Sequence, residues 1–161
     1  MILANKGMYL ETIINNCLEF WISLGLLVQK MPVNNKLISI ENNIIKAKLD
    51  KNQFCDYNGI YKGFYLEFEA KETSKNYFDL NNLKKNQVDK LDLIMKLKGL
   101  TFILIYFHMY DKYFCLNYSY IKKFRKKKIE YDWFINNCYE LQRKNLVLDL
   151  ISYLNHLISY I

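Results

Sequence analysis

An aspartate and a later Glu-Ala-Lys triplet are the residue types in this sequence that best fit metal-assisted chemistry. Asp56 is followed, after twelve intervening residues, by Glu69-Ala70-Lys71. Carboxylate oxygens are the ligands that hard divalent cations prefer. A lysine two positions beyond Glu69 lies on the same side of a strand, where it can orient an attacking water or stabilise charge that develops on a phosphate. The pattern is typical of metal-assisted phosphodiester hydrolysis.

A plainer interpretation of the same residues is an exposed Glu-Lys pair on a strand face. The chain has 16 acidic residues and is rich in lysine, so roughly two such spacings arise from composition alone. The spacing by itself therefore leaves both interpretations open.

The elements around the triplet predict how these side chains are positioned. Asn58-Gly59 and Lys62-Gly63 are turn signals, and apolar residues alternate with polar ones from 64 to 69. This pattern predicts a hairpin between Tyr57 and Lys71. Its period of two places Glu67, Glu69 and Lys71 on one face, and Glu67 is interpreted as peripheral.

The rest of the chain predicts helices packed around a sheet, in the order αββββαββααα. The expected elements are a helix from residue 8 to 23, strands at 37–40 and 44–49 joined by a turn at Asn42-Asn43, the hairpin, a helix at 80–97, a buried central strand at 101–107, an edge neighbour at 113–116, and two or three final helices. The last helix is expected to carry Leu146, Leu150, Leu154, Leu157 and Ile161 on one face. His108 is expected to be a core or edge histidine.

Length and composition favour one domain spanning residues 1–161, with a large core. The two longest charge-free runs have twelve residues each, shorter than the roughly 20 needed to cross a bilayer. With no secretory signal, we expect a cytoplasmic protein without a membrane span. The four cysteines have neither metal-ligand nor disulfide-framework spacing.

A basic run accounts for most of the net charge of +7, which would fall to +1 without it. The run contains Lys122, Lys123, Arg125, Lys126, Lys127 and Lys128. Such a run either contacts a nucleic-acid backbone or forms a solvated helix end.

The residues around the triplet resemble the RecU family of Holliday-junction resolvases. The resemblance rests on Asp56-Tyr-Asn-Gly-Ile-Tyr-Lys-Gly63 and on Phe68-Glu-Ala-Lys-Glu-Thr73. Asn5-Lys-Gly-Met-Tyr-Leu-Glu11, Lys30-Met-Pro32 and Leu148-Asp-Leu-Ile-Ser152 extend it to nearly the whole chain.

The resemblance implies an α/β, restriction-endonuclease-like core, with a mixed β-sheet flanked by helices and a short β stalk within residues 30–56. It implies a homodimer that binds four-way DNA junctions and cuts two opposed strands with Mg²⁺ or Mn²⁺, in recombination and repair. Recombinase and branch-migration proteins are the further partners that it suggests.

Matched position by position, the resemblance assigns Asp56, Glu69 and Gln87 as metal ligands. It assigns two catalytic residues: Lys71 as the transition-state lysine, and Glu11 as an acidic residue facing the site. The predicted DNA contacts are Lys6, Lys30, the stalk lysines Lys46 and Lys48, and the basic run. Lys36 and Lys51 lie in the same stalk segment.

Two departures from the family pattern keep alternatives open. Phe54 stands where the family has a threonine ligand, and Asn86 and Lys90 replace the histidines that flank Gln87. The stalk segment is also shorter than the family's. One alternative is therefore a catalytically weakened, junction-binding recombination accessory protein. A second is a sequence-specific nuclease of the restriction type, because the same core hosts both.

Overall fold

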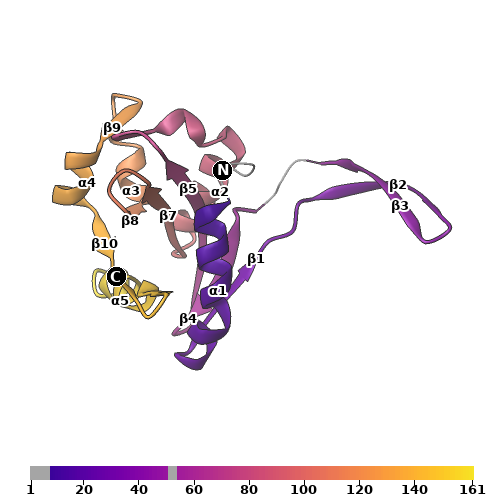
Figure 1. Cartoon of the computed structure of the whole chain (residues 1–161), viewed down its shortest axis with the longest axis horizontal. Helices are drawn as coiled ribbons and strands as arrows, with labels where there is room; N and C mark the ends of the chain where they lie inside the picture. The colour runs from indigo at the N-terminus through magenta and orange to yellow at the C-terminus, as the bar shows by residue number, and fades with distance from the viewer. Residues whose placement is uncertain (1–7, 51–53) are drawn as a thin grey trace.

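The computed structural model describes residues 8–50 and 54–161. A six-stranded sheet forms the body, and an arm extends from it (Figure 1). The sheet contains β1 (Leu26–Lys30), β4 (Tyr57–Tyr61), β5 (Phe64–Thr73), β7 (Leu100–Phe107), β8 (Lys112–Asn117) and β10 (Tyr139–Leu141), in that spatial order. The β5–β7 pair is parallel and the other pairs are antiparallel. The mixed sheet is as predicted.

Helices cover both faces of this sheet. Apolar residues of α1 (Tyr9–Ser23) and α5 (Leu150–Ile158) join the core on one face. On the other face lie α2 (Lys85–Lys96), α3 (Tyr118–Ile121) and α4 (Tyr131–Asn137). Alternate residues of β7 contribute to the two cores, and every β7 residue is buried. This explains why the central strand is a continuous apolar run in the sequence.

The arm is the hairpin of β2 (Asn35–Glu41) and β3 (Ile44–Leu49), and it confirms the two strands predicted there. Asn42 and Asn43 form the turn with φ of 49° and 62°, a left-handed conformation that asparagine tolerates well. Every residue of β3 is exposed. Figure 1 shows that the arm projects away from the body.

One of the two turns predicted for the hairpin between Tyr57 and Lys71 is wrong. Lys62 and Gly63 do turn the chain, with φ of 50° and 82°. Asn58 and Gly59, however, lie inside β4, where β1 pairs closely. A Cβ on Gly59 would lie 2.1 Å from the carbonyl oxygen of Leu27. The glycine therefore permits close approach of a neighbouring strand rather than a turn.

The helix predicted at 80–97 begins late. A short strand, β6 (Tyr77–Asp79), pairs with β9 (Lys128–Glu130). A 3₁₀ turn (Leu80–Asn82) follows, in which the Asp79 carboxylate accepts a hydrogen bond from the Asn81 backbone. This local side-chain bond competes with the helix, which starts only at Lys85.

The carboxyl-terminal third also differs from its prediction. The sequence predicts two or three final helices, and the described residues form three, α3, α4 and α5. However, β10 pairs with β8, so β8 is not an edge strand. Leu146 lies in the turn between β11 (Arg143–Lys144) and β12 (Val147–Leu148), where its φ is 67° and its side chain is 74% exposed. The last helix starts after Asp149, whose side chain caps Ser152.

Other sequence predictions concern thiols, membranes and His108. The four cysteines are free thiols. Among the described helices, none is long and apolar enough to cross a membrane. His108, predicted as a core or edge histidine, instead lies exposed just beyond the end of the central strand β7, with its Nε2 3.2 Å from Oε1 of Glu72.

Candidate active site

Strand β5 presents Glu67, Glu69 and Lys71 on one face, as the period of two predicts. Both glutamates are fully buried, whereas 20% of the Lys71 side chain is exposed. Helix α2 packs beside this face, because Gln87 contacts Glu69 from it. In this cluster the carboxylates are thus buried, and the lysine is the residue that is partly exposed to solvent.

Asp56 lies directly before β4 and is held against β5. Its Oδ2 accepts a hydrogen bond of 2.9 Å from the backbone N–H of Ala70. Its carbonyl oxygen accepts one of 2.8 Å from the Met31 backbone, which follows β1. Asp56 is thereby fixed beside Glu69 and Lys71, so the structure brings the predicted triad together.

Glu69 has an unusual electrostatic environment. Its Oε2 accepts a hydrogen bond of 2.7 Å from Nε2 of Gln87 and lies 3.3 Å from Nζ of Lys71. Its Oε1 is buried and has no hydrogen-bond partner among the described residues. Burial, and next the neighbouring Asp56 carboxyl, raise the pKa of Glu69 to about 8, although Lys71 opposes this.

These donors fit a hard divalent cation. A buried oxygen without a partner beside a second carboxylate is an arrangement that such a cation satisfies. In the described part of the chain, however, no three His, Cys, Asp or Glu side chains form a metal-type cluster. Of the predicted ligands, Asp56 and Glu69 are the two that carry carboxylates.

Gln87 reaches the site, but with its nitrogen. Its Oε1 accepts a hydrogen bond of 2.9 Å from the backbone N–H of Lys84 at the start of α2. Its Nε2 donates to Glu69. In this arrangement the amide orients Glu69, and direct ligation through oxygen would require the side chain to leave Lys84.

Glu11 and Lys30, predicted separately as a catalytic residue and a DNA contact, form an ion pair. The Glu11 carboxylate lies in the first turn of α1, 2.6 Å from Nζ of Lys30. The next residue, Met31, is the one that bonds to Asp56. Lys30, and with it the ion pair, is therefore adjacent in sequence to a residue that is hydrogen-bonded to Asp56.

The two departures near the site contact each other. Nζ of Lys90, on α2, lies 4.9 Å from the centre of the half-buried Phe54 ring, within the range of a cation–π interaction. Phe54 is two residues before Asp56, and Lys90 is three residues after Gln87. Phe54 and Lys90 thus contact each other, and each is close in sequence to a predicted site residue.

The other predicted DNA contacts lie outside the carboxylate cluster. Lys46 and Lys48 are on the arm, where Lys46 lies 3.8 Å from Glu41. The basic run is exposed and extends from the end of α3 to Lys128, the first residue of β9. Within it, Lys122 pairs with Asp92, and Nζ of Lys128 lies 4.8 Å from the centre of the Tyr77 ring. Lys6 and Lys51 lie outside the described residues.

Glu67, interpreted from the sequence as peripheral, is fully buried. Its carboxylate is as buried as that of Glu69 and accepts two hydrogen bonds, from the Cys55 backbone and the Tyr65 hydroxyl. The signal was its place in the alternation with Glu69 and Lys71, because a side chain on that face of a central strand must be covered.

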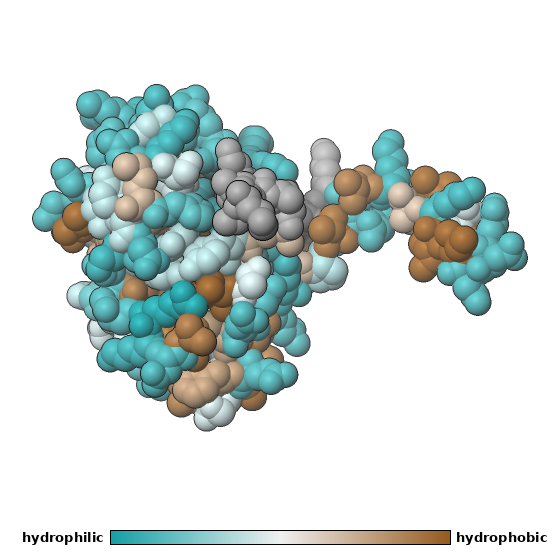
Figure 2. All heavy atoms as spheres, in the orientation of Figure 1, coloured by the Kyte–Doolittle hydropathy of each residue, from teal (hydrophilic) through white to brown (hydrophobic). Residues whose placement is uncertain are grey.

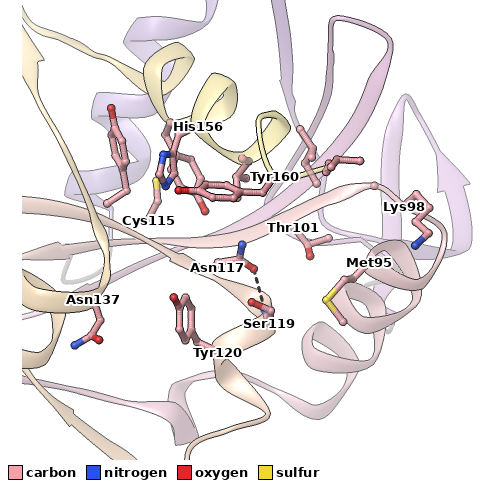
Figure 3. A pocket seen from close by; sticks show the side chains of 16 residues that line it. Met95, Lys98, Thr101, Cys115, Asn117, Ser119, Tyr120, Asn137, His156 and Tyr160 are labelled. Atoms are coloured by element: carbon pink, nitrogen blue, oxygen red, sulfur yellow. Dashed lines mark hydrogen bonds between the residues drawn. The ribbon is translucent and has the colours of Figure 1, made fainter.

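A separate cavity of about 680 Å³ lies between α2, β7, β8 and α5. Figure 3 shows His156 and Tyr160 on one side of it, with Asn117 bonded to Ser119 on the other. None of Asp56, Glu69 and Lys71 lines it. The candidate active site is therefore located by its carboxylates and not by this cavity.

Comparisons with known proteins match this chain over most of its length. The family model described as Recombination protein U (RecU) matches residues 5–157. A protein of Ureaplasma parvum named Holliday junction resolvase RecU is 34% identical, over 86% of this chain and 84% of its own length. One of Streptococcus sanguinis with the same name is 30% identical, over 76% of this chain and 66% of its own length.

A solved structure matches the fold. The Holliday junction resolvase Hjc of Archaeoglobus fulgidus superposes with a TM-score of 0.52 at 11% sequence identity, covering 78% of this chain and 92% of Hjc. The predicted restriction-endonuclease-like core, with its mixed sheet and flanking helices, is thus confirmed.

Proposed function

The chain belongs to the RecU family, and on this basis we propose that it is a structure-selective endodeoxyribonuclease that resolves four-way DNA junctions in recombination and repair. The observation that carries the chemistry is the Asp56–Glu69–Lys71 cluster, with its buried and unpartnered Glu69 Oε1. The names of its relatives support the substrate.

In this proposal Asp56 and Glu69 hold Mg²⁺ or Mn²⁺. When bound, the cation supplies a Lewis acid and a water of lowered pKa. The Lys71 side chain contacts the Glu69 carboxylate and is partly exposed to solvent. In this proposal it orients the attacking water and stabilises negative charge on the phosphate. Gln87 keeps Glu69 in place. Glu11 and its partner Lys30 border the site.

The arm supports a homodimer. Opposed residues in an antiparallel pair share a face, so Leu37, Ala47, Ile40, Ile45 and Leu49 form one apolar face of the hairpin. Each of the four larger side chains is more than half exposed. Figure 2 shows brown, apolar side chains exposed on the arm. A two-stranded hairpin is marginally stable alone, so we propose that a second copy covers this face.

The opposite face of the arm suits DNA. Lys36 is directly opposite Lys48, and Lys46 is opposite Ser39. Like charges placed across a strand pair repel each other, and a phosphate backbone between them relieves this repulsion. Lys46, Lys48 and the exposed basic run therefore serve as phosphate contacts in our proposal.

The test is to incubate the protein with a labelled four-way junction and with linear duplex, with and without Mg²⁺ or Mn²⁺. We expect paired, symmetric cuts in the junction only when a cation is present. Equal cutting of linear duplex would favour a restriction-type nuclease. Junction binding without cutting under either cation would favour the weakened accessory protein, which the contact between Phe54 and Lys90 beside Asp56 supports.

A further inference from the structure

Glu67 is a fully buried carboxylate next to the site that the cleavage chemistry does not use. We propose that it is a positioning residue: it holds the segment that carries Asp56 so that this carboxylate faces Glu69. The inference rests on the proposed function, because it concerns the cation that the two carboxylates would share.

The contact geometry links Glu67 to Asp56 through a single residue. Oε1 of Glu67 accepts a buried hydrogen bond of 2.8 Å from the backbone N–H of Cys55, the residue before Asp56. Asp56 in turn accepts from the Ala70 backbone on β5. The two bonds run in opposite directions between the same segments, since each side donates a backbone N–H to a carboxylate of the other. Together, these two hydrogen bonds fix the position and the orientation of the segment that carries Asp56 relative to β5.

Glu67 is not itself placed to bind the cation. One of its oxygens is occupied by Cys55, and Oε2 accepts a hydrogen bond of 3.0 Å from the Tyr65 hydroxyl. Burial, and next the bond to Glu67, raise the pKa of Tyr65 to about 12, so this hydroxyl stays a donor at neutral pH. A carboxylate with both oxygens bonded and no exposed surface acts through the groups it holds.

The cost of burying this carboxylate indicates that its position matters. A buried charge is expensive unless it is hydrogen-bonded, and the backbone N–H of Cys55 could be satisfied by a neutral acceptor. A neutral acceptor would satisfy this N–H group but would add no charge near Asp56. A carboxylate gives a stronger, shorter bond and also adds negative charge beside the proposed cation.

Three substitutions separate these effects. Glu67→Met keeps the volume and removes the acceptor, Glu67→Gln keeps an acceptor and removes the charge, and Glu67→Asp keeps the charge but shortens its reach by one methylene. As a control, Leu154→Ala truncates a buried residue of the core on the opposite sheet face. It is compared at matched loss of melting temperature.

The readouts are direct Mn²⁺ binding to the DNA-free protein by calorimetry, and the Mn²⁺ concentration for half-maximal junction cleavage. For Glu67→Met we expect both to shift by about 10- to 100-fold, the usual cost of losing an outer-shell partner. Glu67→Gln should recover much of this loss. Junction affinity without a cation should stay unchanged, and Leu154→Ala should leave Mn²⁺ binding unchanged.

The proposal is overturned if Glu67→Met binds Mn²⁺ as tightly as the unsubstituted protein, or if its Mn²⁺ binding is weakened no more than that of Leu154→Ala. If Glu67→Met does not fold, Glu67→Asp decides: an unshifted Mn²⁺ titration overturns the proposal, and a weakened one supports it. An unsubstituted protein that binds Mn²⁺ without cutting junctions contradicts the proposed function alone, because the binding comparison still holds. One that binds no Mn²⁺ overturns both.

Discussion

The carboxylate site and the β2–β3 arm differ in how far their polar and apolar groups are buried and bonded within one copy of the chain. At the site, Glu67 and Glu69 are buried, and backbone donors and Gln87 hold the carboxylates. On the arm, the apolar face is open to solvent. One copy of the chain therefore holds all the residues of the proposed metal site, whereas the exposed arm fits the second copy that we propose. The proposed junction resolution needs both, because two opposed strands would be cut by equivalent sites.

The largest expected effect comes from breaking the site while leaving the arm intact. Lys71→Ala should lower the cleavage rate about 10²- to 10³-fold, as loss of one charge-stabilising group does, and Asp56→Asn should lower it at least as far. Single-turnover cleavage at saturating junction measures this.

Junction binding by both variants should persist, because phosphate contacts elsewhere supply it. Lys75→Ala, an exposed lysine beyond the end of β5, is the matched control and should cut normally. If Asp56→Asn cuts as fast as the unsubstituted protein, the active site has been assigned to the wrong residues.

The converse change breaks the arm and leaves the site intact. Ile40→Asp combined with Ile45→Asp places charges on its apolar face, where these two residues are directly opposed. Light scattering should then give 19.5 kDa instead of about twice that mass, because buried unpaired charge opposes the dimer. Paired cutting should be lost with it.

Ser39→Asp, on the basic face, is the control for added charge. It should weaken DNA binding and leave the dimer in place. An unsubstituted protein that remains monomeric even with junction present would contradict the role assigned to the arm.

A third change lies outside both regions. Replacing Lys126, Lys127 and Lys128 by Ala should weaken junction binding and reduce its logarithmic salt slope by up to about 0.9 for each phosphate that is no longer neutralised. The maximal cleavage rate should stay near normal. The control replaces three exposed lysines elsewhere, Lys62, Lys98 and Lys144. If the two triple variants have equal salt slopes, the basic run is only a solvated surface.

The same contrast explains what the sequence can predict. The strands at 44–49 and 101–107 follow from alternation, apolar runs and turn residues, which act locally. The Asp56–Glu69–Lys71 cluster can be found in the sequence because its spacing and neighbouring residues resemble a known family. Period alone could not show that Glu67 bonds to Cys55, since that contact depends on how β4 enters the sheet.

The errors also have local causes. Asn58-Gly59 has the composition of a turn, but β1 pairs across it, and nothing nearby in the sequence indicates β1 as its partner. Leu146 has helical spacing from Leu150, yet the Asp149 cap starts the helix after it. From the sequence, Asn86 and Lys90 can be recognised only as residues that replace the family's histidines. That Lys90 contacts Phe54 becomes visible only in the folded structure.

A smaller expected effect concerns how the stability of the protein depends on pH through Glu69 at the carboxylate site. The pKa of Glu69 is raised to about 8, against an ordinary value of 4.5. A carboxyl whose pKa is raised by folding stabilises the protein fully below its unfolded pKa, and this contribution is lost as the pH rises through about 8. Without a cation, melting temperature should therefore fall from pH 5 to 8 more steeply than in Glu69→Gln.

Each kcal/mol lost should lower the melting temperature by about 2–4 °C in a chain of this size. Because cation binding requires the ionised carboxylate, Mn²⁺ should restore stability most at high pH in the unsubstituted protein only. Parallel pH profiles for the two proteins would show that burial of Glu69 does not control its ionisation.

The smallest expected effect concerns Phe54, at the border of the site. Phe54→Thr places a hydroxyl two residues before Asp56 and removes the ring beneath Lys90. An added oxygen donor should lower the Mg²⁺ concentration for half-maximal cleavage, but the freed ammonium also brings positive charge near the cation and opposes this gain. The net shift should thus be only a few-fold, and the double variant Phe54→Thr with Lys90→Ala should show a larger one. If the double variant needs as much Mg²⁺ as the unsubstituted protein, Phe54 does not limit cation binding at this site.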